Sequence, residues 1–212
     1  MLVNQRTVLV VALVAWAACG KSSTDPKDRL HSKDPKARLD AVVAIREAGD
    51  TSAVDPLIGV MNRDDDGDVR RAAARALGEL GDARAAAALV TVVASNQASE
   101  LRTVALNALG QLKAPESVAG MIEVWKLDPT VNDNGPIQEG VRYTLRDMSA
   151  VAYDPLIAAL RDPHPNVRAF AADTLALIGD KRAIKAIEPL VEDPDPAVRH
   201  EAETALERLA KP

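Results

Sequence analysis

The amino-acid sequence predicts an all-α fold, a right-handed α-solenoid of about five and a half helical hairpins. The segment 66–93 shows the repeated unit, in which two stretches with apolar residues three or four positions apart flank Gly81-Asp82. Two helices joined by so short a turn fold back on each other but cannot bury both faces alone. Because the same pattern stands on both sides, we expect the hairpins to stack.

The first helix of the unit recurs six times in register. One position of it carries Arg38, Arg70, Arg102, Gln138, Arg168 and Arg199, at steps of 32, 32, 36, 30 and 31 residues. Second helices are expected at 54–61, 85–93, 118–125, 151–160 and 184–191. Since aromatic residues make up only 2% of the chain, the core of this domain, residues 34–212, must consist of closely packed aliphatic side chains.

The repeated pattern V-R-x-x-A-x-x-A-L-G-x-L-G-D is complete at 69–82 and partly kept at 167–180. It resembles the HEAT-like repeat, in the short variety associated with phycobilisome lyases, and the resemblance covers about residues 34–210. The resemblance implies the solenoid fold. It implies little about function, because functions on repeat scaffolds reside in sites that differ between members. The phycobilin lyase activity implied by the family name has no other support in the chain.

Residues 1–18 have the pattern of a signal peptide. Arg6 is followed by an apolar stretch, and small residues precede Cys19, the only cysteine. The apolar segment 7–18 is too short to span a bilayer, which takes roughly 20 residues. The end of the segment resembles a bacterial lipoprotein signal, which implies lipidation at Cys19; an ordinary secretory signal is the alternative.

The segment 19–33 is expected to be a lipidated Cys and a flexible polar tether. Gly20 stands where an inner-membrane retention signal of this class usually has Asp, so the resemblance implies the outer membrane. The expected location is therefore the bacterial cell envelope, with a lipid anchor in the outer membrane and the domain facing the periplasm.

The net charge of −5 and the lack of a basic stripe argue against nucleic acid as a partner. Another protein or a peptide is the expected partner of a monomeric solenoid. The repeated arginines, Arg38, Arg70, Arg102, Arg168 and Arg199, are expected to be structural, with stems packed between repeats and heads that cap turns or pair with Asp. The alternative is that the repeated arginines form a row along the solenoid that binds anions.

We find no pattern of residues that predicts catalysis, a cofactor or a metal. Residues 62–73 are spaced like a calcium loop, but Ala73 stands where the bidentate Glu is required. His200-Glu201 resembles the iron-binding motif of the HEAT-like deoxyhypusine hydroxylases, which use several such pairs, whereas this chain has one. An enzyme on this scaffold, lyase-like or hydroxylase-like, is the alternative hypothesis.

The longest interruption of the repeats, 126–136, directly follows Trp125, the only Trp after residue 16. Long insertions in solenoids often serve binding. Trp125 is therefore either a core residue beside a tolerated loop or the centre of a protein-binding site. The candidate site comprises Trp125, Lys126, Asp128, Asn132, Asp133 and Asn134. The sequence thus predicts a membrane-anchored, non-enzymatic interaction scaffold that binds on its second helices.

Overall fold

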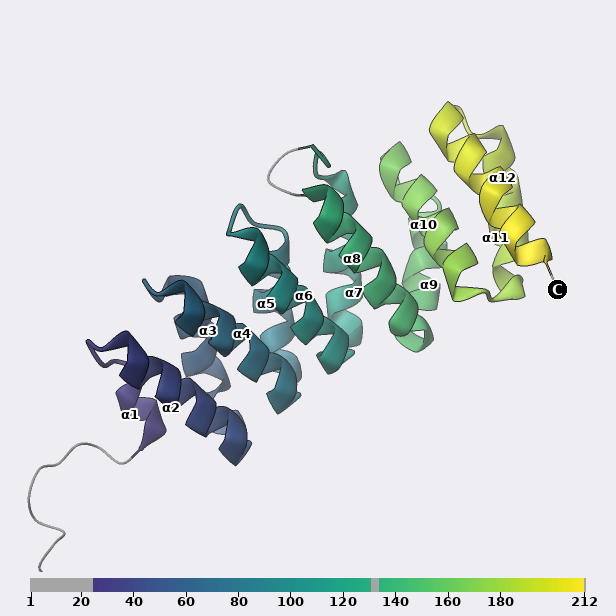
Figure 1. The fold of residues 1–212 in the computed structure, drawn as a ribbon. Coiled ribbons are helices and arrows are strands. Elements are labelled where there is room, and N and C mark those ends of the chain that lie inside the picture. Colours follow the sequence, from purple (N-terminus) through teal and green to yellow (C-terminus); the bar gives the residue numbers. More distant parts are fainter. Residues whose placement is uncertain (1–24, 131–133, 212) are drawn as a thin grey trace, which may run out of the picture.

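The computed structural model describes residues 25–130 and 134–211, which form one elongated stack of helices (Figure 1). Twelve α-helices and no strand occur in these two ranges. The helices lie in two layers, with the first helix of each repeat in one layer and the second helix in the other (Figure 1). The structure confirms the predicted α-solenoid.

The six first helices match the six predicted copies. They are α2 (Pro35–Ala48), α4 (Gly67–Leu80), α6 (Ser99–Leu112), α8 (Asn134–Asp147), α10 (Pro165–Ile178) and α12 (Pro196–Ala210). The second helices are α3 (Val54–Arg63), α5 (Ala86–Val93), α7 (Pro115–Glu123), α9 (Ser149–Ala159) and α11 (Ile184–Ile187). Helix α11 is short because the chain tightens to a 3₁₀ turn at Glu188–Glu192, where Pro189 supplies no backbone donor.

Gly-Asp pairs end three of the first helices. The glycine adopts a left-handed conformation that a side chain would strain, and the following carboxylate accepts the N–H two residues further on. The glycines are Gly49, Gly81 and Gly179, with φ of 64°, 69° and 80°, and their partners are Asp50, Asp82 and Asp180. This chemistry turns the chain sharply into each second helix.

Small residues allow the first helices to approach closely. In α4, Ala73, Ala76 and Leu77 are fully buried. A Cβ built on Gly78 would lie 2.7 Å from the Ala108 Cα of α6, so the two helices are in backbone contact there. Such tight stacking explains how a chain with few aromatic residues forms a continuous core.

The packed domain begins earlier than the sequence suggests. Helix α1 (Pro26–Arg29) precedes α2, and Leu30 is buried in the core. Lys27 Nζ donates to Asp50 Oδ2 at 3.0 Å and to Ser52 Oγ at 2.9 Å. The expectation of a flexible tether is therefore wrong for residues 26–33, which cover the first repeat.

The predicted signal peptide and lipidation site, Cys19 included, lie outside the described residues. Within 25–130 and 134–211, none of the helices combines the length and the apolar character that crossing a bilayer requires.

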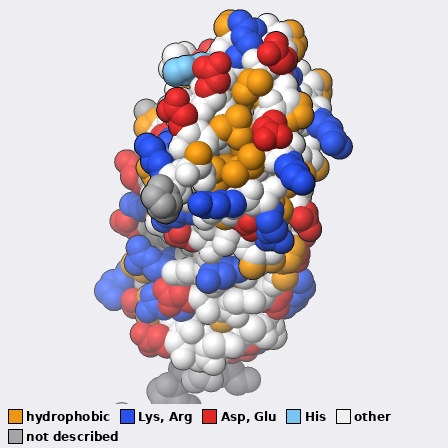
Figure 2. Space-filling view, turned by 90° about the vertical axis from the view of Figure 1, so that its right-hand side faces the viewer, with side chains coloured by type: hydrophobic (Ala, Val, Ile, Leu, Met, Phe, Trp, Pro, Cys, Tyr) orange, Lys and Arg blue, Asp and Glu red, His pale blue; other side chains and the backbone are white. Residues whose placement is uncertain are grey.

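Figure 2 shows the C-terminal end of the solenoid, formed by α11 and α12. Hydrophobic side chains gather there among acidic and basic ones (Figure 2). The partly buried hydrophobic residues of this region are Ile184, Ala186, Val191 and Leu206. This end of the stack thus combines polar and apolar surface.

Candidate functional site

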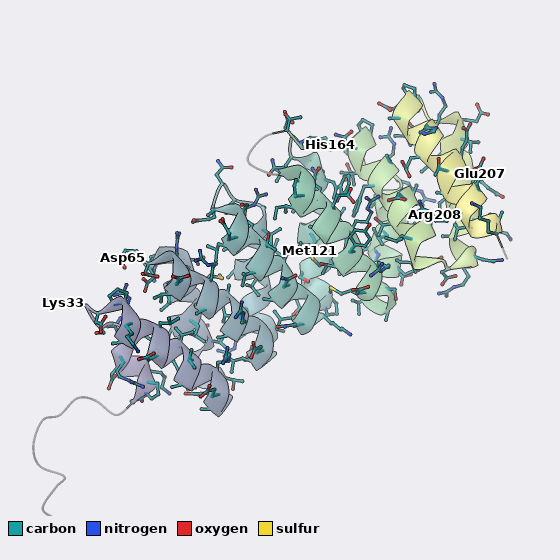
Figure 3. The ribbon with its side chains drawn as sticks, viewed as in Figure 1. Lys33, Asp65, Met121, His164, Glu207 and Arg208 are labelled. Atoms are coloured by element: carbon teal, nitrogen blue, oxygen red, sulfur yellow. The ribbon has the colours of Figure 1, made fainter. Side chains whose placement is uncertain are left out.

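The recurrent arginines hold the turns between repeats. Arg38 donates to both carboxylate oxygens of Asp64, each at 2.7 Å, and to a carbonyl of the turn before its own helix. Arg168 does the same with Asp193, at 2.8 and 2.7 Å, and with the turn before α10. Each of these arginines therefore ties its own turn to the next one. Lys33, Asp65 and His164 mark the edge along which three of these turns lie (Figure 3).

The other three arginines donate to neutral groups among the described residues. Arg70 Nη1 donates to Gln97 Oε1 at 2.9 Å, and Arg199 Nη1 donates to the Asp193 carbonyl at 2.7 Å. Arg102 is fully buried and donates to Asn134 Oδ1 at 2.7 Å. All five arginines thus bond to groups in the turns or at the helix ends of the solenoid, as expected of structural residues.

The carboxylates that receive these arginines have lowered pKa values. The hydrogen bonds from Arg168 hold the pKa of Asp193 below its ordinary value, against the opposing effect of burial. For Asp64, burial acts to raise the pKa, but the bonds from Arg38 and from the Asp66 N–H outweigh it. Both groups therefore contribute stability in their charged form.

The fourth repeat departs from this pattern. Gln138 replaces the arginine and donates to two carbonyls of the segment 124–127, at 3.2 and 2.9 Å. Asn134 is buried: its amide oxygen accepts from Arg102 and its Nδ2 donates to the Asp128 carbonyl at 2.8 Å. The prediction that Asn134 faces a partner is therefore wrong, because it joins the third repeat to the loop before α8.

Trp125 lies in a 3₁₀ turn, Val124–Lys126, at the end of α7. It is half-buried, and its ring stacks on Phe170 of α10 with centroids 4.3 Å apart and an interplanar angle of 16°. Its indole Nε1–H is buried and has no acceptor in the part of the chain that the structure describes. Trp125 thus packs on the first helix of the fifth repeat.

A pocket of about 490 Å³ lies where Trp125 meets α8, α10 and α12. Its walls combine an aromatic and aliphatic side with a side of charged and amide groups. The lining residues are Trp125, Pro129, Gly135, Gln138, Glu139, Arg142, Asn166, Ala169, Phe170, Asp173 and Glu201. The pocket is therefore built mainly by first helices, whereas we predicted binding on the second helices.

An ion-pair network crosses the pocket between three helices. Arg142 of α8 pairs with Glu139 on its own helix and with Asp173 of α10. Arg208 of α12, labelled in Figure 3, reaches the other oxygen of Asp173 at 2.7 Å. Burial opposes the charge of Arg142, but the two carboxylates hold its pKa above the ordinary value. These pairs fix the spacing of α8, α10 and α12 around the pocket.

Glu201 is the carboxylate of the pocket without such a partner. It is half-buried on α12 and makes no hydrogen bond or ion pair with any residue that the structure describes. Burial raises its pKa, and the charge of Asp173 raises it further, while the charges of Arg142, Arg208 and His200 act more weakly in the opposite direction. Unpaired and desolvated carboxylates are typical of functional sites.

The remaining candidate residues are engaged locally or lie outside the described ranges. Lys126 Nζ lies 2.7 Å from Glu123 and 3.5 Å from Asp162, and Asp128 accepts two bonds from Thr130. Asn132 and Asp133 fall in the segment 131–133, which the structure does not describe. Of the predicted residues that the structure describes, only Trp125 lines the pocket.

Sequence reasoning missed the residues of α10 and α12 that complete the site. Phe170 is the only Phe in the chain, and it occupies a position held in the other copies by Asp40, Ala72, Val104, Gly140 and Glu201. A search for two rare aromatic residues in neighbouring repeats could have paired it with Trp125. Glu201 we considered only as half of a metal motif. No group of three or more His, Cys, Asp or Glu side chains suited to a metal ion occurs in 25–130 and 134–211.

Comparison with known proteins identifies the repeats. The model of the family described as HEAT repeats matches residues 26–110 and 153–212. The chain belongs to the HEAT-repeat family. The unmatched segment between these two ranges, 111–152, contains Trp125, the long loop and α8, so one side of the pocket lies where the repeats of this HEAT-repeat protein depart from the family pattern. The other side, on α10 and α12, lies within the matched repeats.

Several solved structures are similar to this HEAT-repeat protein. An engineered protein is 22% identical, with 87% of this chain and 94% of that chain covered and a TM-score of 0.49. The complex of CpcE and CpcF of phycocyanin lyase from Nostoc sp. PCC7120 is 20% identical over 91% and 97%, with a TM-score of 0.45. The archaeal HEAT-like repeats protein from Thermococcus onnurineus NA1 is 17% identical over 87% and 85%, with a TM-score of 0.44. No curated protein sequence matches the chain.

Proposed function

We propose that this HEAT-repeat protein is a non-enzymatic scaffold that binds another protein at the pocket between α8, α10 and α12. The pocket at the one interrupted junction of the array carries this proposal. Trp and Arg are the residues most enriched at the energetic centres of protein interfaces, and Trp125 and Arg142 line this pocket. An exposed Tyr143 with Arg142 and Arg146 close to its ring extends the same surface along α8.

The contacts within the pocket support binding over catalysis. Arg142 and Asp173 are held by ion pairs, and no Ser, Cys, His or Lys among the described residues lines the pocket as a nucleophile. The competing hypothesis is an enzyme on the HEAT-like scaffold. Transfer of a phycobilin to phycocyanin by the purified chain, or a hydroxylation that requires added iron, would favour that hypothesis and contradict ours.

The test is affinity capture from bacterial envelope extract with the full chain and two matched variants. Ala169→Arg places a long side chain in the pocket wall. Thr103→Arg introduces the same side chain at the equivalent, exposed position of α6. At that position the second repeat already has Arg71, so the helix tolerates it. We expect Ala169→Arg to lose the captured protein and Thr103→Arg to retain it. Equal capture by all three chains would place the binding surface elsewhere.

We further propose that the scaffold is held at a bacterial membrane by lipid on Cys19, with the domain in the periplasm and the anchor in the outer membrane. The small-residue pair before the only cysteine supports this. Two or three acyl chains give lasting membrane residence, whereas one chain gives marginal binding. We expect Cys19→Ala to block incorporation of radiolabelled palmitate and to leave uncleaved precursor. Normal processing and release of the variant would contradict the anchor.

A further inference from the structure

The charges that line the pocket are unbalanced. Glu139, Asp173 and Glu201 face a single lining cation, Arg142. Arg142 pairs with the first two carboxylates, and Arg208 reinforces Asp173, so the positive charge is already used. Glu201 remains as a half-buried carboxylate without an ion pair among the described residues. A cation is the complement that this arrangement lacks.

The aromatic wall suits the stem and head of a basic side chain. Trp125 and Phe170 stack on each other, with Ala169 and Pro129 beside them on the pocket surface. Long basic side chains pack their methylene stems on apolar surface while the charged head reaches polar groups. An indole ring also attracts a cation electrostatically. The 490 Å³ of the pocket accommodates such a side chain together with its backbone.

Two features describe the ligand. The indole N–H of Trp125 is buried and has no acceptor among the described residues, so a shift of the ring on binding that brought it to a backbone carbonyl of a peptide would satisfy this donor. The net charge of −5 attracts a basic partner surface over longer distances. The first feature favours an extended segment of a protein over a small free amine, and the second favours a segment that carries Lys or Arg.

We propose that the pocket binds an Arg or Lys side chain of the partner protein, with its charged head on Glu201 and its stem against Trp125. This inference rests on the proposed scaffold function and adds the chemical class of the bound segment. Arg fits better than Lys because its planar guanidinium can pair with a carboxylate through two hydrogen bonds and stack on the indole.

The experiment uses Trp125 as the reporter. In the full chain with Trp16→Phe, Trp125 is the only Trp, so its fluorescence reports on the pocket alone. The probes are the peptide acetyl-Gly-Ala-Arg-Ala-Gly-amide and its counterparts with Lys, citrulline or Glu in the centre. Citrulline has nearly the shape of Arg without its charge. We expect saturable fluorescence changes with the Arg and Lys peptides and at least about tenfold weaker binding of the citrulline and Glu peptides.

Two variants locate the effect. Glu201→Gln removes the carboxylate charge at a position without a partner, so folding should be preserved, and we expect it to reduce the preference for Arg over citrulline to less than about threefold. Glu203→Gln, an exposed change on the same helix, should leave the preference intact. Equal binding of Arg and citrulline peptides, or an undiminished preference in Glu201→Gln, overturns the proposal. So does binding of free arginine amide as tight as that of the peptide.

The outcome is separable from the scaffold proposal. If the Arg peptide fails while Ala169→Arg still abolishes capture of a protein from envelope extract, the pocket binds a protein by another chemistry. If capture is independent of the pocket while the Arg peptide binds, the basic-residue site stands and the scaffold proposal is wrong at this surface.

Discussion

Replacing Trp125 with Ala should destabilise the solenoid measurably. A fully buried Trp truncated to Ala costs roughly 3 to 5 kcal/mol, and a stacked aromatic pair contributes about 0.5 to 1.5 kcal/mol beyond its buried area. Trp125 is half-buried but stacks on Phe170, whose own side chain is only 2% exposed and would gain a cavity. We therefore expect a loss of about 2 to 4 kcal/mol in the free energy of unfolding.

The assay is thermal unfolding followed by circular dichroism. A loss of that size lowers the midpoint by roughly 4 to 16 °C for a chain of this length. Trp125→Phe keeps a ring on Phe170 and removes the indole N–H that has no acceptor, so its midpoint should fall by less than about 4 °C. Tyr143→Ala, at a residue 48% exposed on α8, is the control and should shift the midpoint by less than about 2 °C.

A midpoint of Trp125→Ala within about 2 °C of the native chain would refute this reasoning, because the stack would then contribute nothing to stability. A fall in the midpoint of Trp125→Phe as large as that of Trp125→Ala would also contradict it, because we attribute the stabilisation to the ring contact with Phe170 and not to the indole N–H.

The remaining predictions concern the repeat junctions. Asp193→Ala leaves a nearly buried arginine unpaired and should cost about 3 kcal/mol in urea unfolding, whereas Asp65→Ala, at a largely exposed carboxylate, should cost less than about 1 kcal/mol. The pKa values of Asp64 and Asp193 are lowered in the folded state, so their stabilisation is complete above the ordinary carboxyl pKa and is lost as the pH falls through the lowered values. The melting temperature should therefore fall when the pH is lowered below about 4. An unchanged melting temperature there would contradict this reasoning. Gly78→Ala should destabilise the fold by about 1 to 3 kcal/mol, because the added Cβ would lie 2.7 Å from the α6 backbone. Gly110→Ala, at the same repeat position, has its nearest neighbour at 3.4 Å and should be neutral or stabilise the fold by up to about 1 kcal/mol. Calorimetry that gave the reverse order would refute the packing argument.

The fold was predictable because the same signals recur. An apolar stripe of period 3.6 recurs at nearly constant steps, and Gly-Asp turns follow three of its six copies, so the order and pairing of the helices are determined. Helix α1 was missed, since the four residues Pro26–Arg29 are too few to show a period and their stability comes from contacts of Lys27 and Leu30 with the first repeat. Such contacts depend on packing across the hairpin, which a local pattern does not contain.

The candidate site was predictable only in part. Trp125 stood out by composition and by the loop after it, but the sequence could not decide between core and surface, and the structure shows a residue that serves both. Asn134 resembled an exposed loop residue because its partner Arg102 lies 32 positions earlier. The roles of Phe170 and Glu201 depend on how α8 sits between its neighbours, so their place in the pocket required the three-dimensional structure.

The central claim is that the junction at α8 is the surface that binds a protein, and site-specific photo-cross-linking in the bacterial cell tests it most directly. A photoreactive residue replaces Glu139, an exposed residue on the pocket rim, or, as the control, Glu47, an exposed residue of α2 at the other end of the solenoid. We predict one discrete adduct to another protein from position 139, absent from position 47 and lost when Ala169→Arg is added. No adduct at position 139, or the same adducts at both positions, would contradict the account.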